Sequence, residues 1–147
     1  MPQPSSSYAG DATPQEAWEA LAGDPSAALV DVRTSAEWAF VGIPDLSELS
    51  KRPVLAEWQT YPSMQVDQGF VDRVAEALQA TGAGAGTPVY FLCRSGVRSQ
   101  AAAAAMAAKG FTACFNVAGG FEGPLDAQRH RGASAGWKAV GLPWTQS

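Results

Sequence analysis

The chain has 147 residues, the length of a single folded domain, and we expect one domain rather than two. Hydrophobic residues make up 46% of it and charged residues 16%, which excludes intrinsic disorder for most of its length. Its net charge of -4 disfavours a broad nucleic-acid-binding surface. Any bound anion must therefore meet a local cluster of positive charge.

The chain carries no sign of export, membrane insertion or metal binding. Its two cysteines, Cys93 and Cys114, are too few for a disulfide framework, and no Cys/His spacing indicates zinc. The N-terminal segment lacks the basic region and apolar run of a signal peptide, and no stretch approaches the ~20 apolar residues of a membrane span. We expect a cytoplasmic protein with reduced thiols, no metal and no cofactor.

The first elements are set by composition and capping residues. Residues 1–12 are rich in Pro, Ser and Gly and predict a flexible N-terminal arm, so that the domain occupies residues 13–147. Thr13 opens a Thr-Pro-Gln-Glu capping box with Pro at the first helical position. A short helix to about Leu21 follows.

A buried strand is predicted over residues 28–32, because this apolar run contains β-branched residues and lies between turn formers. Asp31 interrupts the run and is unusual for a buried strand. Thr34 begins a second capping box, and the helix it predicts ends at Gly42.

The middle of the chain is harder to assign. Residues 47–66 contain one candidate strand, at 53–56, within an aromatic-rich connection. Apolar residues then recur at helical spacing from Phe70 to Leu78, after Asp67 as the cap. We therefore predict a third helix, which ends at Gly82.

The second half alternates strands and helices. Residues 88–92 predict the clearest strand, and the alanine-rich stretch 100–109 predicts a helix that ends at Gly110. Residues 113–117 predict another short strand. This alternation indicates an α/β fold with a mainly parallel sheet, whose functional residues lie beyond the carboxyl ends of the strands.

Cys93 lies where the strand at 88–92 ends and the next helix begins. Free backbone N–H groups and the positive end of the helix dipole favour a thiolate there. Arg94 and Arg98 add positive charge, and Gly96 lets the backbone bend around an anion. We predict that Cys93 is a nucleophile.

Cys114 lies between Ala113 and Phe115 in a predicted strand, which is typical of a buried packing residue; a resolving thiol is the alternative. The loop length bears on the chemistry at the other thiol. Tyrosine phosphatases and low-molecular-weight arsenate reductases place five residues between Cys and Arg, whereas four separate Cys93 from Arg98. The shorter loop suits a sulfur atom better than phosphate, so these two activities are the less favoured alternative.

Several segments together carry a family pattern: Leu29-Val30-Asp31-Val32-Arg33 with Glu37-Trp38, Ile43-Pro44, Val89 to Ser99, and Asn116 to Phe121. This pattern resembles the single-domain rhodaneses, which are thiosulfate-type sulfurtransferases. The resemblance covers about residues 12–125, and the tail from Gly136 to Trp144 resembles that of a bacterial subgroup. It implies a rhodanese-like α/β fold with a central, mainly parallel five-stranded sheet flanked by helices on both faces.

The resemblance also implies a reaction. The Cys93 thiolate takes sulfane sulfur from a small anionic donor, thiosulfate or a persulfide, and passes it to a thiol or cyanide acceptor or to a sulfur-relay protein. No cofactor, nucleic acid or membrane takes part. The active-site loop that binds the substrate comprises Arg94, Ser95, Gly96, Val97, Arg98 and Ser99.

The supporting residues are Asp31, Arg33 and Glu37. The family suggests that Arg98 pairs with Asp31, and we expect Arg33 to pair with Glu37. Two roles stay open: Arg94 either binds the donor or is solvated, and the two loop serines either bond the sulfur or act as helix caps.

Two departures from the family bear on substrate choice. The usual Gly-His-Ile-Pro is Val41-Gly42-Ile43-Pro44 here, without the histidine, and the aromatic segment from Trp58 to Met64 is longer than in the smallest members. The single histidine, His130, lies in a polar stretch and is expected to be solvated.

The main alternative function is that of a sulfur carrier, a module that receives sulfur on Cys93 from a desulfurase and has no thiosulfate activity.

Overall fold

A five-stranded parallel sheet forms the centre of the computed structural model, which describes residues 8–60, 63, 65–123, 127 and 136–146. The strand order is β1-β8-β7-β2-β4, and every neighbouring pair is parallel. The predicted sheet is therefore confirmed. Its strands are β1 (Gly10–Ala12), β2 (Ala28–Asp31), β4 (Val54–Leu55), β7 (Val89–Leu92) and β8 (Cys114–Val117).

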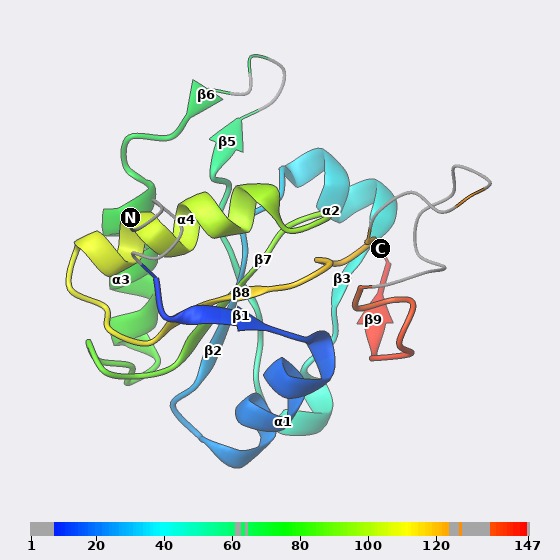
Figure 1. Ribbon diagram of the computed structural model, residues 1–147, viewed down its shortest axis with the longest axis horizontal. Coiled ribbons are helices and arrows are strands. Elements are labelled where there is room, and N and C mark those ends of the chain that lie inside the picture. Colours follow the sequence, from blue (N-terminus) through cyan, green and yellow to red (C-terminus); the bar gives the residue numbers. More distant parts are fainter. Residues whose placement is uncertain (1–7, 61–62, 64, 124–126, 128–135, 147) are drawn as a thin grey trace.

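Helices cover both faces of the sheet, as predicted (Figure 1). Alternating strand residues divide between two cores: Leu29 packs in the cluster that includes α1, and Val30 in the cluster that includes α3 and α4. The strand β2 is thus apolar on both sides, as a covered parallel sheet requires of its central strands. The helices are α1 (Pro14–Gly23), α2 (Ser35–Val41), α3 (Phe70–Ala80) and α4 (Val97–Ala108).

Both predicted capping boxes are present. The Thr13 hydroxyl accepts the Glu16 N–H at 3.1 Å, and the Glu16 carboxylate accepts the Thr13 N–H at 2.8 Å. Thr34 begins α2 in the same way. The cap of α3 differs from the prediction, because Gly69 is the N-cap and Asp67 instead accepts the Gly69 N–H at 2.8 Å, two residues on.

The prediction of a flexible arm over residues 1–12 is wrong for Gly10–Ala12, which form the edge strand β1. The Ala9 N–H donates to the Cys114 carbonyl at 2.8 Å, so the ladder begins before the strand itself. Pairing with the edge of β8 supplies the order that the Pro/Ser/Gly composition does not indicate. Residues 1–7 lie outside the described part of the chain.

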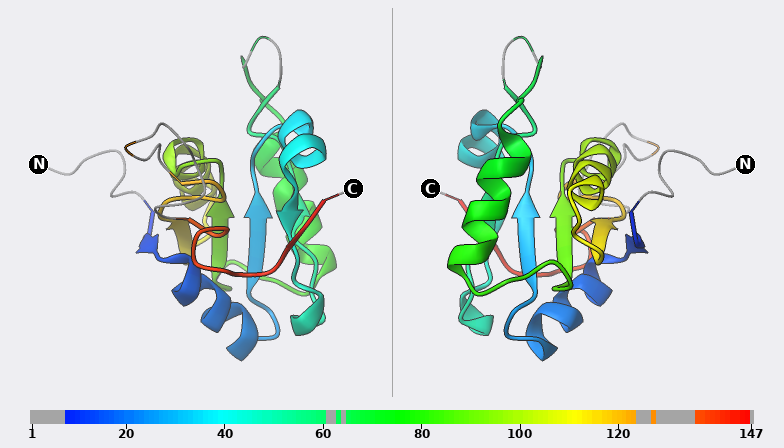
Figure 2. Two further views of the ribbon diagram at one scale, coloured as in Figure 1. Left: turned by 90° about the vertical axis from the view of Figure 1, so that its right-hand side faces the viewer. Right: turned by 90° about the vertical axis from the view of Figure 1, so that its left-hand side faces the viewer.

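The segment after α2 contains short elements. β3 (Ile43–Pro44) pairs antiparallel with β9 (Trp144–Thr145), so the C-terminal tail folds back beside α2. The 3-10 helix η2 (Ser47–Leu49) follows β3 in the chain. β5 (Gln59–Thr60) and β6 (Gln65–Val66) form a hairpin that projects beyond the carboxyl ends of the central strands (Figure 2). The predicted strand at 53–56 is confirmed as β4.

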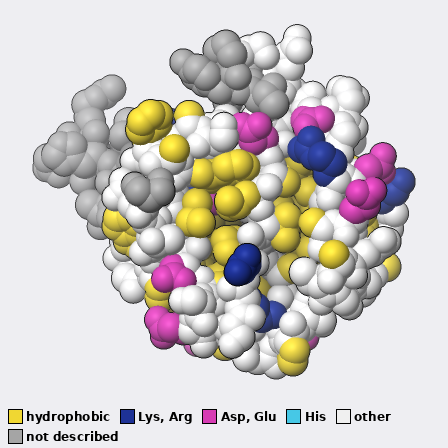
Figure 3. Space-filling model, turned by 180° about the vertical axis from the view of Figure 1, so that it is seen from behind, with side chains coloured by type: hydrophobic (Ala, Val, Ile, Leu, Met, Phe, Trp, Pro, Cys, Tyr) yellow, Lys and Arg dark blue, Asp and Glu magenta, His cyan; other side chains and the backbone are white. Residues whose placement is uncertain are grey.

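A groove of about 730 Å³ lies near the amino ends of β2 and β4, and Pro25, Leu29, Pro44, Lys51 and Val54 are among its lining residues. Seen from behind, hydrophobic side chains gather in the middle of the molecular surface (Figure 3). No residue of the loop 93–99 lines this groove. Within the described ranges, no helix is long and apolar enough to cross a membrane.

Candidate active site

Cys93 follows β7 directly, and α4 begins four residues later at Val97. Leu92, the last residue of β7, is the register partner of Asp31, the last residue of β2, so the two strands end at the same edge of the sheet. The Cys93 side chain is 1% exposed. The sequence prediction of a cysteine between a buried strand and a helix is confirmed.

Two donors from the loop contact the Cys93 sulfur. The Gly96 N–H donates to Sγ at 3.0 Å, and the Ser99 hydroxyl lies 3.2 Å from it. Gly96 has φ +115° as the N-cap of α4, a conformation that favours glycine. The sequence predicted that several N–H groups of residues 94–99 would face the sulfur; in the described structure the Gly96 N–H alone makes this hydrogen bond, and Ser95 makes none to it.

The turn after β8 holds the loop from below. The Phe121 N–H donates to the Cys93 carbonyl at 2.8 Å, and the Glu122 N–H donates to the Arg94 carbonyl at 2.9 Å. Gly120 has φ +62°, and a Cβ there would lie 2.5 Å from the Cys93 carbonyl oxygen. Only glycine therefore allows the two backbones to approach so closely.

The ion pairs of the site are exchanged relative to the prediction. Arg98 pairs with Glu37 rather than with Asp31, through Arg98 Nη1 to Glu37 Oε1 at 2.7 Å and Nη2 to Oε2 at 2.9 Å. Asp31 pairs instead with Arg33, at 2.6 Å between Oδ2 and Nη2. Arg33 is two residues along the same chain, so its guanidinium reaches the carboxylate at the end of β2 without leaving its own segment.

The Glu37–Arg98 pair ties α2 to the first turn of α4. Burial alone raises the pKa of Glu37, but the hydrogen bonds from Arg98 and Thr34 outweigh it and lower this pKa from 4.5 to about 2. The same bond to Glu37 raises the pKa of Arg98. Arg98 thus keeps a positive charge near Cys93, while both of its terminal nitrogens donate to the Glu37 carboxylate.

The Asp31–Arg33 pair is fully buried, with both side chains 0% exposed. Arg33 Nη2 also donates to the Gly42 carbonyl at 2.7 Å, and its guanidinium lies 4.2 Å from the centre of the Phe121 ring. The pair therefore joins the end of β2 to the end of α2 and to the turn beneath the loop. All three predicted support residues, Asp31, Arg33 and Glu37, lie next to the site, although with exchanged partners.

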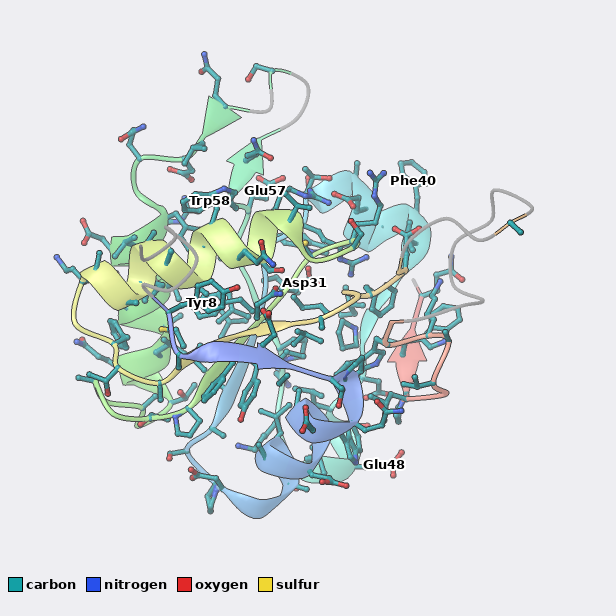
Figure 4. All side chains as sticks on the ribbon, viewed as in Figure 1. Tyr8, Asp31, Phe40, Glu48, Glu57 and Trp58 are labelled. Carbon is teal, nitrogen blue, oxygen red and sulfur yellow. The ribbon has the colours of Figure 1, made fainter. Side chains whose placement is uncertain are left out.

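Two loop residues face solvent. Arg94 is exposed, and Val97 is 75% exposed at the start of α4. Phe40, on α2, is 80% exposed and points outward from that helix (Figure 4). The loop therefore offers one cation and one apolar side chain to an approaching molecule, above a sulfur that is itself buried.

A chain of hydrogen-bonded side chains behind the sulfur was not predicted from the sequence. Ser99 hydrogen-bonds to Asn116 of β8, and the Asn116 side-chain N–H donates to Asp11 of β1 at 3.0 Å. The sequence did contain a signal for Asn116, because it is a polar residue within an apolar strand, as Asp31 is.

In the described part of the chain, no group of three or more His, Cys, Asp and Glu residues is placed to hold a metal ion. His130 lies outside the described residues.

Comparison with known proteins places the chain in a family. The model of the family described as the STR4 middle domain matches residues 9–147. The chain belongs to this family. The STR4 middle-domain family has a rhodanese-like fold, which agrees with the sheet and helices described above.

Relatives of this STR4-type domain occur in bacteria and plants. The crystal structure of Rv0390 from M. tuberculosis is 49% identical, with a TM-score of 0.85, covering 95% of this chain and 99% of that one. The protein RP600 of Rickettsia prowazekii is 37% identical over 129 residues, which are 88% of this chain and 91% of that protein. The chloroplastic rhodanese-like domain-containing protein 4 of Arabidopsis thaliana is 26% identical over 132 residues, 90% of this chain but 25% of that protein.

One more distant structure shares the fold. The polysulfide-sulfur transferase homodimer from Wolinella succinogenes has a TM-score of 0.58 at 18% identity, covering 98% of this chain and 82% of that one. At this identity the similarity shows the fold alone. The resemblance to rhodaneses stated from the sequence is thus confirmed at the level of the family and the fold.

Proposed function

We propose that this protein is a sulfurtransferase that carries sulfane sulfur as a persulfide on Cys93. The observation that supports this most is the environment of the sulfur: a backbone N–H at 3.0 Å and a hydroxyl at 3.2 Å converge on Sγ at the start of a helix. Such donors stabilise an anionic sulfur, whether thiolate or persulfide.

The reaction proceeds in two steps. The Cys93 thiolate attacks the outer sulfur of thiosulfate, the S–S bond of the donor breaks, and sulfite leaves with the bonding electron pair. Cys93 then carries an S–S⁻ group. An acceptor thiolate or cyanide attacks the outer sulfur of this group, takes it as a persulfide or as thiocyanate, and returns the Cys93 thiolate. Charge balances in both steps, and no net oxidant is needed.

The arginines have different roles in this proposal. Arg98 is committed to Glu37 through both terminal nitrogens, so it holds the loop and supplies charge at a distance. Arg94 is exposed on the loop and is the residue proposed to attract an anionic donor. These roles also argue against a phosphatase or arsenate reductase, because both terminal nitrogens of Arg98 donate to Glu37 and cannot at the same time bind an oxyanion in a bidentate manner.

A sulfur carrier that exchanges sulfur with a partner protein is the second candidate. Val97, an apolar side chain within the loop, is 75% exposed, so it is open to contact with a partner protein and offers no charge or hydrogen bond to a small anion. Both candidates share the Cys93 persulfide and differ in the donor. The chemistry of the donor therefore separates them.

The test is intact-mass spectrometry after incubation with thiosulfate, and in parallel with a low-molecular-weight persulfide. We expect a gain of about 32 Da, one sulfur atom, which is lost on adding cyanide or a reductant and is missing in Cys93→Ala. Cys114→Ala is the matched control and should gain the same mass. An adduct from the persulfide but not from thiosulfate would select the carrier function, and no adduct from either would refute both.

A further inference from the structure

The Ser99 hydroxyl lies between two acceptors in a closed environment. Its oxygen is 3.2 Å from Cys93 Sγ and within hydrogen-bond distance of Asn116 Oδ1, and the Ser99 side chain is fully buried. A hydroxyl has a single hydrogen, so it donates to the sulfur or to the amide oxygen, but not to both at once.

Asp11 fixes which atom of the Asn116 amide faces Ser99. The two residues are register partners in the parallel pair of β1 and β8, and Asn116 Nδ2 donates to Asp11 Oδ1 at 3.0 Å. An ionised carboxylate accepts but does not donate, so the amide nitrogen must face Asp11 and the amide oxygen must face Ser99. The Tyr8 hydroxyl, which approaches from the N-terminal side of β1 (Figure 4), donates to the same carboxylate oxygen at 3.0 Å.

We propose that Asn116 is a positioning residue that holds the Ser99 hydrogen while Cys93 is a neutral thiol, and releases it when the sulfur becomes anionic. In the neutral state the Cys93 S–H donates to Ser99 Oγ, and the Ser99 hydroxyl donates to Asn116 Oδ1. When the thiol loses its proton to solvent, or carries a persulfide, the Ser99 hydroxyl turns and donates to sulfur. Asn116 Oδ1 then loses its donor.

This exchange makes Asn116 a competitor of the sulfur for one hydrogen. Removing Asn116 should therefore favour the anionic sulfur, whereas removing Ser99 should disfavour it. A structural role for Asn116 makes the opposite prediction, because Ser99 would then lose its support and donate less well. The inference deepens the proposed function, since it assumes that Cys93 is the reacting sulfur.

Other charged or titratable groups around the site also act on Cys93, and the experiment must hold them constant. Arg98 interacts electrostatically with Cys93 and is itself held by Glu37. The main comparison, between the Ser99 and Asn116 variants, leaves the charged and titratable groups of every surrounding element unchanged. These groups are Arg98 of α4, Glu37 of α2, Asp31 and Arg33 at the end of β2, Tyr8 and Asp11 at β1, and Arg94 and Glu122 of the loops.

The test is the pH dependence of iodoacetamide alkylation at Cys93, followed by intact mass, in a double-mutant cycle. Ser99→Ala should raise the midpoint of the pH–rate profile by about one pH unit, tenfold in the ionisation constant, since a hydrogen bond to a charged group is lost. Asn116→Ala should lower the midpoint, by about half a unit to one unit. The double variant should match Ser99→Ala, because Asn116 acts only through that hydroxyl.

Asp11→Asn provides a second variant at an exposed position. This variant replaces a carboxylate, which only accepts hydrogen bonds, with an amide that can also donate, so the Asn116 amide is free to turn its oxygen away from Ser99. The midpoint of the pH–rate profile should therefore fall more when Ser99 is present than in the Ser99→Ala background. The remaining shift in that background measures the loss of charge alone. Val117→Ala, also buried in β8, is the control for packing and should leave the midpoint unchanged.

A midpoint that rises in Asn116→Ala, or an equal shift with and without Ser99, would overturn the inference. Alkylation uses no sulfur donor, so the outcome is independent of sulfur transfer. If the cycle behaves as expected but no persulfide forms, the proposed function fails while the hydrogen-bond exchange stands.

Discussion

The two thiols of this protein are equally hidden, yet their surroundings differ: Cys93 directly follows β7, and Cys114 is the first residue of the neighbouring strand β8. Cys93 is 1% exposed and Cys114 is 0% exposed. Two donors face the sulfur of Cys93, at 3.0 and 3.2 Å. The sulfur of Cys114 faces the Phe111 carbonyl oxygen, an acceptor, at 3.5 Å.

Because the surroundings differ, we expect the two thiols to differ in reactivity despite their equal burial. Burial raises the pKa of Cys114 to about 12, because the anion would be desolvated without compensation. At Cys93 the loop supplies the hydrogen bonds that an anion needs, and the charge of Arg98 acts in the same direction. The turn at Gly96 is what brings these donors to one of the two sulfurs.

The largest expected contrast is in alkylation of the native protein. At pH 8, Cys93 should react with iodoacetamide at least about 100-fold faster than Cys114, since a thiol with a pKa near 12 has almost no thiolate. Peptide mapping after timed quenching measures both rates in one sample. In denaturant the two rates should converge, and a difference that persisted there would mean that the fold is not its cause.

The next effect concerns the pair that holds the loop. Glu37→Gln should destabilise the protein by about 2 to 3 kcal/mol near neutral pH, because the pKa of Glu37 falls from 4.5 to about 2 on folding. A lowered carboxylate pKa contributes stability above pH 4.5, and this contribution is lost as the pH falls through 2. The gap between wild type and variant in chemical denaturation should therefore close between these pH values.

Glu19→Gln, at an exposed site on α1, is the matched control and should change stability by less than about 0.5 kcal/mol at every pH. The loosened loop of Glu37→Gln should also slow alkylation of Cys93 while leaving Cys114 unreactive. A stability gap that stayed constant down to pH 2 would contradict the assignment of the shift to Glu37.

The smallest effect is expected at the second thiol itself. Cys114→Ala removes one buried sulfur and should cost about 1 kcal/mol through the small cavity it leaves. Sulfur loading of Cys93 should stay within twofold of wild type, since the two sulfurs share no hydrogen-bond partner among the described residues. A large loss of loading would instead indicate that Cys114 acts as a resolving thiol.

The sequence predicted most of the fold because local signals and tertiary packing agree. Thr13 and Thr34 form capping boxes, and the apolar run before Cys93 leads directly into an alanine-rich helix. The strand at Gly10–Ala12 was missed because its order comes from pairing with β8, which lies more than 100 residues away. The pairing of β3 with β9 escaped prediction for the same reason.

At the site, the loop was predictable and the pairing of its charges was not. The position of Cys93 follows from a strand, a glycine and a helix in succession. Which arginine reaches which carboxylate depends on side-chain paths in space, and Arg33 reaches Asp31 from within its own segment. Asn116 and Asp11 meet through strand register, which a single sequence does not reveal.

The central claim, that Cys93 and not Cys114 accepts sulfur, is tested most directly by locating the adduct. The protein is incubated with thiosulfate or a persulfide, quenched with an alkylating agent, digested and analysed by mass spectrometry. We expect the added sulfur of about 32 Da on the peptide that contains Cys93 and none on the peptide that contains Cys114. Sulfur on Cys114, or on neither peptide, would contradict the account.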